Sequence, residues 1–340
     1  MYIGLSLSPF GHHPSAWRRH RGTAALGFQA LAAQVKLAEQ AALDFVFLPD
    51  LAGKRPQRAL HPEATPFEPT LLISALATVT RRIGLVGTAL TTQHEPYNLA
   101  RRFASLDLVS HGRTGWNLAP GDNSDRAGEY VQLVQALWQS WDADAFLYDK
   151  QGGRFFDPAK MHVLDHKGEY FTVRGPLNVN PSPQGAPVIA ATVTGAAQSP
   201  AAGKAELILV EAATIEEMIA IADRLRSSRN GPEPRILASI APHIATSMDE
   251  AEALRREFPM ELPELVGTPE TIADSIAGWQ GNFDGFLIHP PLAPDGVQLV
   301  VDGLVPALRR RGLFRDGYEA DTLRGHLGLA APAILPGGAR

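Results

Sequence analysis

Short apolar runs, mostly of β-branched residues and leucine, alternate with longer segments of helical periodicity along most of the chain. Eight of these runs have the length of a buried strand and end in polar or turn-forming residues. They occupy residues 2–7, 45–48, 83–88, 114–118, 188–191, 207–210, 236–241 and 285–288. The pattern predicts eight strands with helices between them.

The segments between these runs carry the signals of amphipathic helices. In residues 28–42, the apolar positions Leu31, Val35 and Ala38 share one helical face. Thr268 can cap a helix that starts at Pro269, because threonine side chains accept hydrogen bonds from the first turn of a helix. Proline suits the first helical position, where the backbone N–H group has no partner within the helix. Further helices are predicted over residues 68–80, 131–141 and 269–280.

The alternation of strand and helix predicts an α/β fold with parallel strands, since each helix returns the chain to the same end of the sheet. Eight such units are typical of a closed (β/α)8 TIM barrel. The alternative is an open doubly wound sheet, in which a G-x-G-x-x-G turn should follow the first strand. Residues 8–13 read Ser-Pro-Phe-Gly-His-His, so the barrel is favoured.

Residues 142–187 interrupt the alternation after strand 4 and are rich in Gly, Pro, Asp and aromatic residues. We interpret them as an insertion that contains a β-hairpin formed by residues 161–165 and 169–173. Insertions at the C-terminal face of a barrel shape the mouth of the active site, and we expect this one to do so. The chain is thus divided into one barrel domain over residues 1–323 and a loosely ordered C-terminal tail over residues 324–340.

Composition narrows the class of protein. Acidic residues outnumber basic ones by 36 to 31, for a net charge of −5, which argues against a nucleic-acid or anionic-membrane partner. No apolar run approaches the roughly 20 residues that span a bilayer, and the N-terminal residues lack a signal-peptide pattern. The absence of cysteine excludes thiol catalysis and thiolate metal sites. We expect a cytoplasmic globular enzyme.

Hydrolytic and metal chemistry find little support in the motifs. No G-x-S-x-G turn is present. The side chains of the adjacent His12 and His13 should point apart on an extended segment, so no metal is expected there. Thr192-Val193-Thr194-Gly195 follows a strand and precedes a predicted helix, where backbone N–H groups can hold a phosphate. Capping of that helix by Thr194 explains the same residues, and the sequence leaves both interpretations open.

Polar residues gather at the predicted carboxyl ends of the strands, the end that carries the active site of a barrel. They are Asp50 after the second strand, Thr88, Thr91 and Thr92 at the third, Asn117 at the fourth, His289 after the eighth, and His13 and Trp17 in the loop after the first. Together they predict a wide polar pocket with neutral donors and few charges. Such a pocket suits a large planar heterocycle with a phosphate group.

A series of short sequence motifs extends from the first predicted strand almost to the C-terminus. They include Gly11-His12-His13-Pro14-Ser15-Ala16-Trp17-Arg18, Phe47-Leu48-Pro49-Asp50, Glu95-Pro96-Tyr97-Asn98-Leu99-Ala100-Arg101, Gly112-Arg113-Thr114-Gly115-Trp116-Asn117, Asp165-His166-Lys167-Gly168-Glu169-Tyr170-Phe171, Val266-Gly267-Thr268-Pro269-Glu270 and Arg310-Arg311-Gly312-Leu313-Phe314. This series resembles the bacterial luciferase-like flavin monooxygenases, in particular the branch of nitrilotriacetate, EDTA and dibenzothiophene-sulfone monooxygenases.

The resemblance implies a (β/α)8 barrel and a two-component flavin-dependent monooxygenase. It implies reduced FMN supplied by a separate flavin reductase, with O2 as the oxidant. The implied substrate is a small organic molecule that contains nitrogen or sulfur or that belongs to a biosynthetic pathway. A homodimer is also implied.

The resemblance further assigns roles to the residues at the strand ends. Asp50 and Thr91 would lie along the isoalloxazine and ribityl chain, Asn117 at the flavin edge and Thr194 at the phosphate. We expect His13 and Asn117 to be catalytic, and His13, Trp17 and His289 to contact the substrate.

The chain departs from the family pattern at three places. The segment at residues 118–124 is short, Thr192-Val193-Thr194 replaces a Gly-x-Ser turn, and the long insertion before Val266-Gly267-Thr268 is missing. These departures motivate two alternatives: a non-catalytic or flavin-deficient paralogue that acts as a partner subunit, and a deazaflavin-dependent oxidoreductase. The motifs favour the FMN branch over the deazaflavin enzymes.

Overall fold

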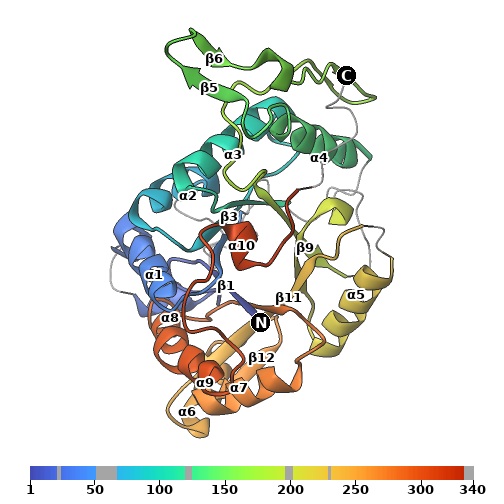
Figure 1. Cartoon of the computed structure of the whole chain (residues 1–340). Coiled ribbons are helices and arrows are strands. Elements are labelled where there is room, and N and C mark those ends of the chain that lie inside the picture. The colour runs from blue at the N-terminus through green and yellow to red at the C-terminus, as the bar shows by residue number, and fades with distance from the viewer. Residues whose placement is uncertain (21–23, 51–66, 119–124, 196–201, 229–230, 333–340) are drawn as a thin grey trace.

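Eight parallel strands close into a barrel in the computed structural model, which describes residues 1–20, 24–50, 67–118, 125–195, 202–228 and 231–332 (Figure 1). The strands are β1 (Tyr2–Ser6), β2 (Phe45–Leu48), β3 (Gly84–Thr88), β4 (Thr114–Leu118), β9 (Val188–Thr194), β10 (Leu207–Glu211), β11 (Arg235–Ile244) and β13 (Gly285–Ile288). They follow this order around the ring, and β13 pairs with β1 to close it. The predicted fold class and all eight predicted strands are confirmed.

Helices surround the ring, as expected for this fold. They are α1 (Phe28–Gln40), α2 (Pro69–Val79), α3 (Pro96–Ser110), α4 (Asp125–Trp138), α5 (Ile215–Ser227), α6 (Met248–Glu257), α7 (Pro269–Gly278), α8 (Asp295–Leu299) and α9 (Val305–Arg310). The predicted cap of α7 is confirmed, because the hydroxyl of Thr268 accepts a hydrogen bond from the N–H of Thr271 at 3.3 Å. Among the described residues, no helix has the length and apolar character needed to cross a bilayer.

Three strands were not predicted: β5 and β6 of the insertion, described below, and β12 (Glu264–Gly267). β12 pairs with the last residues of β11, which continue beyond the barrel wall, and thus lies outside the ring. Four residues with a glycine at the end carry too little periodicity to be recognised from the sequence.

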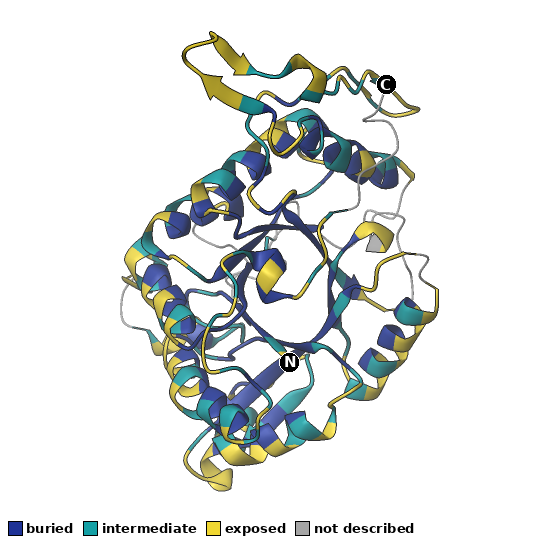
Figure 2. Cartoon of the chain, in the orientation of Figure 1, coloured by how far each residue is buried: buried dark blue, intermediate teal, exposed yellow. Residues whose placement is uncertain are grey.

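The barrel interior is filled by side chains rather than open. Phe45 and Phe47 of β2 pack there against leucine and valine side chains from the other strands, and Figure 2 shows the strands as a continuous buried ring. Gly4 makes room for this packing, because a Cβ atom at that position would lie 2.4 Å from the ring of Phe45. The apolar core therefore occupies the middle of the barrel and leaves only its two ends for other roles.

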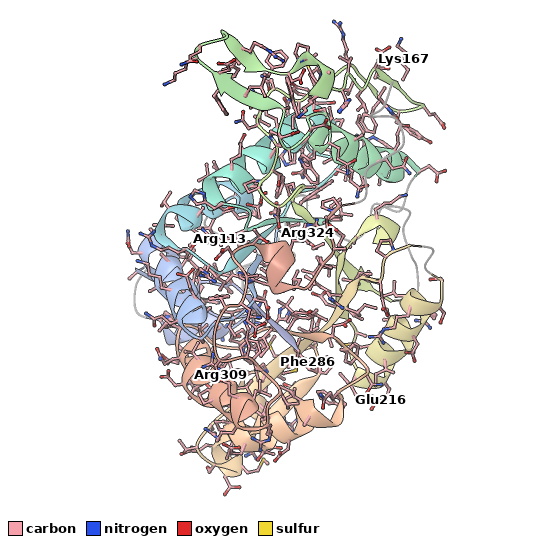
Figure 3. All side chains as sticks on the ribbon, in the orientation of Figure 1. Arg113, Lys167, Glu216, Phe286, Arg309 and Arg324 are labelled. Atoms are coloured by element: carbon pink, nitrogen blue, oxygen red, sulfur yellow. The ribbon has the colours of Figure 1, made fainter. Side chains whose placement is uncertain are left out.

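The N-terminal end of the barrel is closed by the C-terminal segment of the chain. Helix α10 (Leu323–His326) lies inside the ring in Figure 1, with Leu323 and Leu327 fully buried. Figure 3 shows Arg324 on this helix, beside the strands; its guanidinium Nη2 lies 3.0 Å from Glu206 Oε2. His326 Nε2 lies 2.7 Å from the carbonyl oxygen of Arg82.

The expectation of a loosely ordered tail from Arg324 onward is therefore wrong for residues 324–332, while residues 333–340 lie outside the described residues. Arg324 and His326 suggest an exposed segment when they are considered alone. Burial of charged and polar groups is possible because each has a hydrogen-bonding partner. Those partners lie 118 and 244 residues away in the sequence, so local patterns do not reveal them.

Residues 142–187 contain two antiparallel hairpins, and Figure 1 shows the first of them, β5 with β6, outside the ring of helices. They are β5 (Phe146–Asp149) with β6 (Arg154–Phe156), and β7 (His166–Lys167) with β8 (Thr172–Val173). The hairpin predicted for residues 161–165 and 169–173 is present, but its paired residues are 166–167 and 172–173. Glu129 of α4 explains the shift, since its carboxylate accepts hydrogen bonds from the N–H groups of Tyr170 and Phe171 and holds them in the turn.

The insertion connects the end of α4 to the start of β9, and both lie at the N-terminal end of the strands. Its second hairpin reaches the start of α4, at the opposite end, where Phe171 packs against Tyr130 with 5.5 Å between ring centroids and lies 4.9 Å from the guanidinium of Arg126. That the insertion shapes the active-site mouth stays a prediction.

Candidate functional site

The carboxyl ends of the strands form the mouth of the barrel, opposite α10. Side chains alternate between the two faces of a strand. The positions that point inward in the middle of the barrel are apolar, such as Val86, Leu209 and Leu287. One inward step closer to the mouth, the residues become polar: Ser6, Thr88, Asn117, Ser239 and His289 are all buried there, and Thr192 is partly buried.

Asn117 lies at the centre of a neutral hydrogen-bond network on one side of the mouth. Its Nδ2 donates to Thr88 Oγ1 at 3.0 Å, and its Oδ1 accepts from Thr192 Oγ1 at 3.3 Å. The two contacts fix the plane of the amide between β3, β4 and β9. The predicted location of Asn117 and Thr88 at one rim of the barrel is thus confirmed. The catalytic and flavin-binding roles of Asn117 remain predictions.

On the opposite side of the mouth, the rings of His12 and His289 meet edge to face, with 4.8 Å between their centroids. His12 Nε2 lies 3.0 Å from the carbonyl oxygen of Ser6 and must donate, because a carbonyl can only accept. Burial lowers the pKa of His12, and burial together with the neighbouring His12 lowers the pKa of His289 well below its usual value. Both rings are therefore neutral at pH 7.

Gly11 sets the position of His12. Its φ of +107° lies in the region that favours glycine, and a Cβ atom there would lie 2.3 Å from the carbonyl oxygen of Pro291. The close approach lets the N–H groups of His12 and His13 donate to the carbonyl oxygens of Pro290 and Pro291 at 2.9 and 3.1 Å. The loop after β1 is thus pinned to the loop after β13, and His12 is held against His289.

His13 points away from this pair, as predicted for adjacent histidines. Its Nδ1 accepts a hydrogen bond from the N–H of Ser15, and its ring lies edge-on to Phe258 at 5.2 Å. Trp17 is 39% exposed, with the guanidinium of Arg18 over its ring. The roles of His13 and Trp17 remain predictions. The sequence singled out His13, but His12 is the histidine that joins His289, and nothing in the sequence distinguishes the two.

Phe258 belongs to a contact that the sequence did not reveal. The segment between α6 and β12 reaches the loop after β1, where Glu257 pairs with Arg19 at 2.6 Å and the guanidinium of Arg19 lies 4.8 Å from the ring of Phe258. This is the place where the family pattern has a longer insertion. The short segment here covers His13 directly.

Asp50 and Thr91 lie after the adjacent strands β2 and β3. Burial and the nearby Arg102 lower the pKa of His94, and the carboxylate of Asp50 acts in the opposite direction. Thr91 is buried, and its carbonyl oxygen accepts from Arg126 Nη1 at 3.3 Å. Asp50 is the last residue before residues 51–66, which lie outside the described residues. Their contacts with flavin remain predictions.

Thr194 is the exposed last residue of β9, beside Glu211 of β10, and Gly195 follows with a φ of +80°. The predicted helix start falls on residues 196–201, outside the described residues. Phosphate binding by Thr194 and capping of a helix by Thr194 therefore both stay predictions.

Two other kinds of site find no support. In the described ranges, no three His, Asp or Glu side chains converge as metal ligands would. An apolar hollow between β1, β2, α1 and α2, lined by Leu7, Leu31, Leu48 and Leu72 among others, has an accessible volume of about 10 Å³. That is room for about one water molecule, so it is a packing gap rather than a substrate site.

Comparison with known proteins places this geometry among flavin enzymes. The model of the luciferase-like monooxygenase family matches residues 10–264. N-acetyl-S-(2-succino)cysteine monooxygenase of Bacillus subtilis is 35% identical, with 97% of each chain covered. Nitrilotriacetate monooxygenase component A of Aminobacter aminovorans is 31% identical, with 98% of this chain and 97% of the relative covered. A solved structure of riboflavin lyase with modified FMN and riboflavin superposes with a TM-score of 0.85 at 27% identity, covering 99% of this chain and 98% of the other.

The relatives are longer in places. The alignment with the Bacillus subtilis enzyme extends over 428 positions, whereas this chain has 340 residues. The relative therefore carries segments that this chain lacks, in keeping with the shortened loops noted in the sequence.

Proposed function

The chain belongs to the luciferase-like monooxygenase family, and we propose that it uses reduced FMN and O2 to oxygenate a small organic substrate. The observation that carries this proposal is the mouth of the barrel, where the buried amide of Asn117 and the neutral rings of His12 and His289 lie at the carboxyl ends of the strands. The groups nearest the barrel centre are neutral amide, hydroxyl and imidazole groups. That suits a flavin ring system better than it suits hydrolysis of an ionic substrate.

The donor set at the mouth fits FMN. Asp50, Thr91 and Asn117 would hold the isoalloxazine and ribityl chain, and Thr194 would hold the phosphate. The modified FMN in the riboflavin lyase structure supports this choice of cofactor. When bound, reduced FMN supplies the electrons that activate O2.

The chain's own residues would bind, orient and exclude water. The apolar layer of Val86, Leu209 and Leu287 closes the floor of the mouth, so water has no access from below. The hydrogen bonds from Thr88 and Thr192 hold the Asn117 amide in one orientation before a ligand arrives. Such preorganised neutral donors stabilise developing charge without a cost for reorienting solvent.

The partner assignments are part of the proposal. The name of the Aminobacter relative, nitrilotriacetate monooxygenase component A, supports a second component, which we propose to be a flavin reductase. Dependence on a cellular reductase favours a cytoplasmic location. A homodimer is part of the proposal because the chain belongs to this family.

The two alternatives are not favoured. The relatives of 31% and 35% identity are named monooxygenases, and neither a non-catalytic subunit nor a deazaflavin oxidoreductase finds support from them.

Anaerobic titration of the purified protein with reduced FMN tests the proposal. We expect saturable binding at micromolar flavin, followed by substrate-dependent consumption of O2. No change in flavin absorbance or fluorescence at tens of micromolar would contradict it.

A further inference from the structure

The first two turns of α4 contact two segments that are far apart in the sequence. One is the loop after β3, residues 89–95, which carries Thr91 at the mouth of the barrel. The other is the turn between β7 and β8, residues 168–171. Side chains at positions 126, 129 and 130 of α4 reach these two segments. Their spacing of three and four residues makes them neighbours on the surface of the helix.

Glu129 fixes the turn between β7 and β8 against α4. Its Oε1 accepts a hydrogen bond from the N–H of Phe171, and its Oε2 accepts one from the N–H of Tyr170, each at 3.0 Å. The turn can pass this close because residue 168 is Gly168, where a Cβ atom would lie 2.0 Å from Glu129 Oε1. The backbone of the turn therefore determines where the ring of Phe171 lies on the helix.

The ring of Phe171 contacts the guanidinium of Arg126. The guanidinium carbon lies 4.9 Å from the ring centroid, which is a cation–π distance. Both side chains are partly exposed. An arginine side chain in such a place has many accessible rotamers, so a contact that selects one of them decides where its N–H groups point. Phe171 thus orients Arg126.

Arg126 in turn holds the loop after β3, because its Nη1 donates a hydrogen bond to the carbonyl oxygen of Thr91 at 3.3 Å. A second bond to this loop runs from the hydroxyl of Tyr130 to the carbonyl oxygen of His94, at 2.9 Å. Tyr130 is completely buried, so its position is fixed by the core. Arg126 is not, and its bond is therefore the link through which Phe171 can act on the loop.

The same turn occupies a competing partner of Arg126. Glu129 follows Arg126 by three residues, a spacing at which opposite charges pair on a helix surface. Both oxygens of Glu129 accept hydrogen bonds from the turn instead. The second hairpin of the insertion thus engages this acid and at the same time offers the guanidinium an aromatic face.

We propose that Phe171 is a positioning residue for the flavin site: its ring orients Arg126, which holds the loop after β3 and with it Thr91 at the mouth. This inference rests on the proposed flavin-dependent function, because Thr91 is one of the residues proposed to hold FMN. The second hairpin thereby gains a role in the site without touching the ligand. The motif Asp165-His166-Lys167-Gly168-Glu169-Tyr170-Phe171, which the flavin contacts leave unexplained, forms that hairpin and its turn.

Hydrogen–deuterium exchange of the flavin-free protein provides the first test. The N–H of Gln93 donates to the carbonyl oxygen of Leu90 at 3.2 Å, so its exchange rate reports opening of the loop after β3. We expect Phe171→Leu to raise this rate by about three- to tenfold, because leucine is apolar but has no aromatic face. Phe171→Tyr keeps the aromatic face and should retain the parent rate.

Affinity for reduced FMN, measured by anaerobic titration, provides the second test. Phe171→Leu should weaken binding by about three- to tenfold, and Phe171→Tyr should leave it unchanged. Arg126→Met removes the cation, so it should raise the exchange rate of Gln93 and weaken FMN binding at least as much as Phe171→Leu does. Addition of Phe171→Leu to Arg126→Met should cause no further loss, because the two residues act through one link. Arg126→Met keeps the test decisive if Phe171→Leu does not fold.

Tyr170→Leu is the matched control. It removes a 43% exposed aromatic side chain from the same turn and leaves the backbone bonds to Glu129 in place. It should change neither the exchange rate of Gln93 nor the affinity for FMN. Effects equal to those of Phe171→Leu would indicate general loosening of the hairpin and would overturn the proposal.

The proposal is also overturned if Phe171→Leu leaves the exchange rate or the FMN affinity at the parent value, if Phe171→Tyr fails to retain them, or if the losses in the double variant add. Failure of the unmodified protein to bind FMN is a separate result and contradicts the proposed function. The exchange rate of Gln93 in the flavin-free variants then still decides whether Phe171 holds the loop.

Discussion

His289 and Asn117 face each other across the mouth of the barrel. Asn117 belongs to β4 and His289 follows β13, and these two strands are four positions apart in the ring of eight. One side of the mouth is a completed hydrogen-bond network, and the other carries polar atoms without partners.

Replacement of Asn117 by alanine should weaken FMN binding by about ten- to a hundredfold, because it removes a ring contact and releases Thr88 and Thr192. The measurement is a fluorescence titration with FMN. The exposed Asn98 of α3 supplies the control variant, Asn98→Ala, which should bind FMN normally. A large fall in melting temperature with unchanged affinity would mark Asn117 as a structural residue.

Replacement of Gly11 by alanine should destabilise the protein by about 1–3 kcal/mol and displace His12 from His289. The physical reason is the φ of +107° together with a Cβ position only 2.3 Å from a carbonyl oxygen. Urea unfolding measures the loss. Gly317→Ala is the matched control, since no atom lies within 4 Å of its Cβ position, and an equal loss in both variants would contradict the role given to Gly11.

Replacement of Leu323 by alanine should lower the free energy of unfolding by about 2–5 kcal/mol, because the side chain is fully buried in the N-terminal end of the barrel. FMN affinity should be retained, since the mouth is at the other end. The partly exposed Leu299 gives the control variant, Leu299→Ala, which should cost much less. A Leu323 variant as stable as the parent would show that α10 does not plug the barrel.

His326 should make the protein sensitive to acid. Burial lowers its pKa from 6.5 to about 4. The folded state then binds fewer protons than the unfolded state between these values, so the stabilisation is complete above pH 6.5 and is lost as the pH falls toward 4. Between pH 7 and pH 4.5, the parent should lose about 2 kcal/mol more than His326→Gln. Parallel stability curves for the two proteins would exclude this role.

The barrel could be predicted because its strands are buried on both faces and leave continuous apolar runs in the sequence. The helix α10 could not, since Arg324 and His326 are buried only by partners far away in the chain. The insertion was found, but its attachment at the N-terminal end of the strands depends on its following a helix rather than a strand.

The candidate site was predictable in part. Asn117 lies near the end of β4 and His289 directly follows β13. Polar residues at these positions predicted a polar rim at the carboxyl ends of the strands. Ser6 and Ser239 were missed, because a serine inside an apolar run has no special signal until the inward face of the strand is known. The choice between His12 and His13 depends on the backbone of Gly11, which the sequence alone does not specify.

The most direct measurement of the central claim is a crystal structure of the protein with FMN bound. The account predicts the isoalloxazine in the mouth of the barrel, in contact with Asn117. Flavin bound elsewhere on the protein, or a mouth that stays filled by the protein's own side chains at saturating FMN, would contradict it.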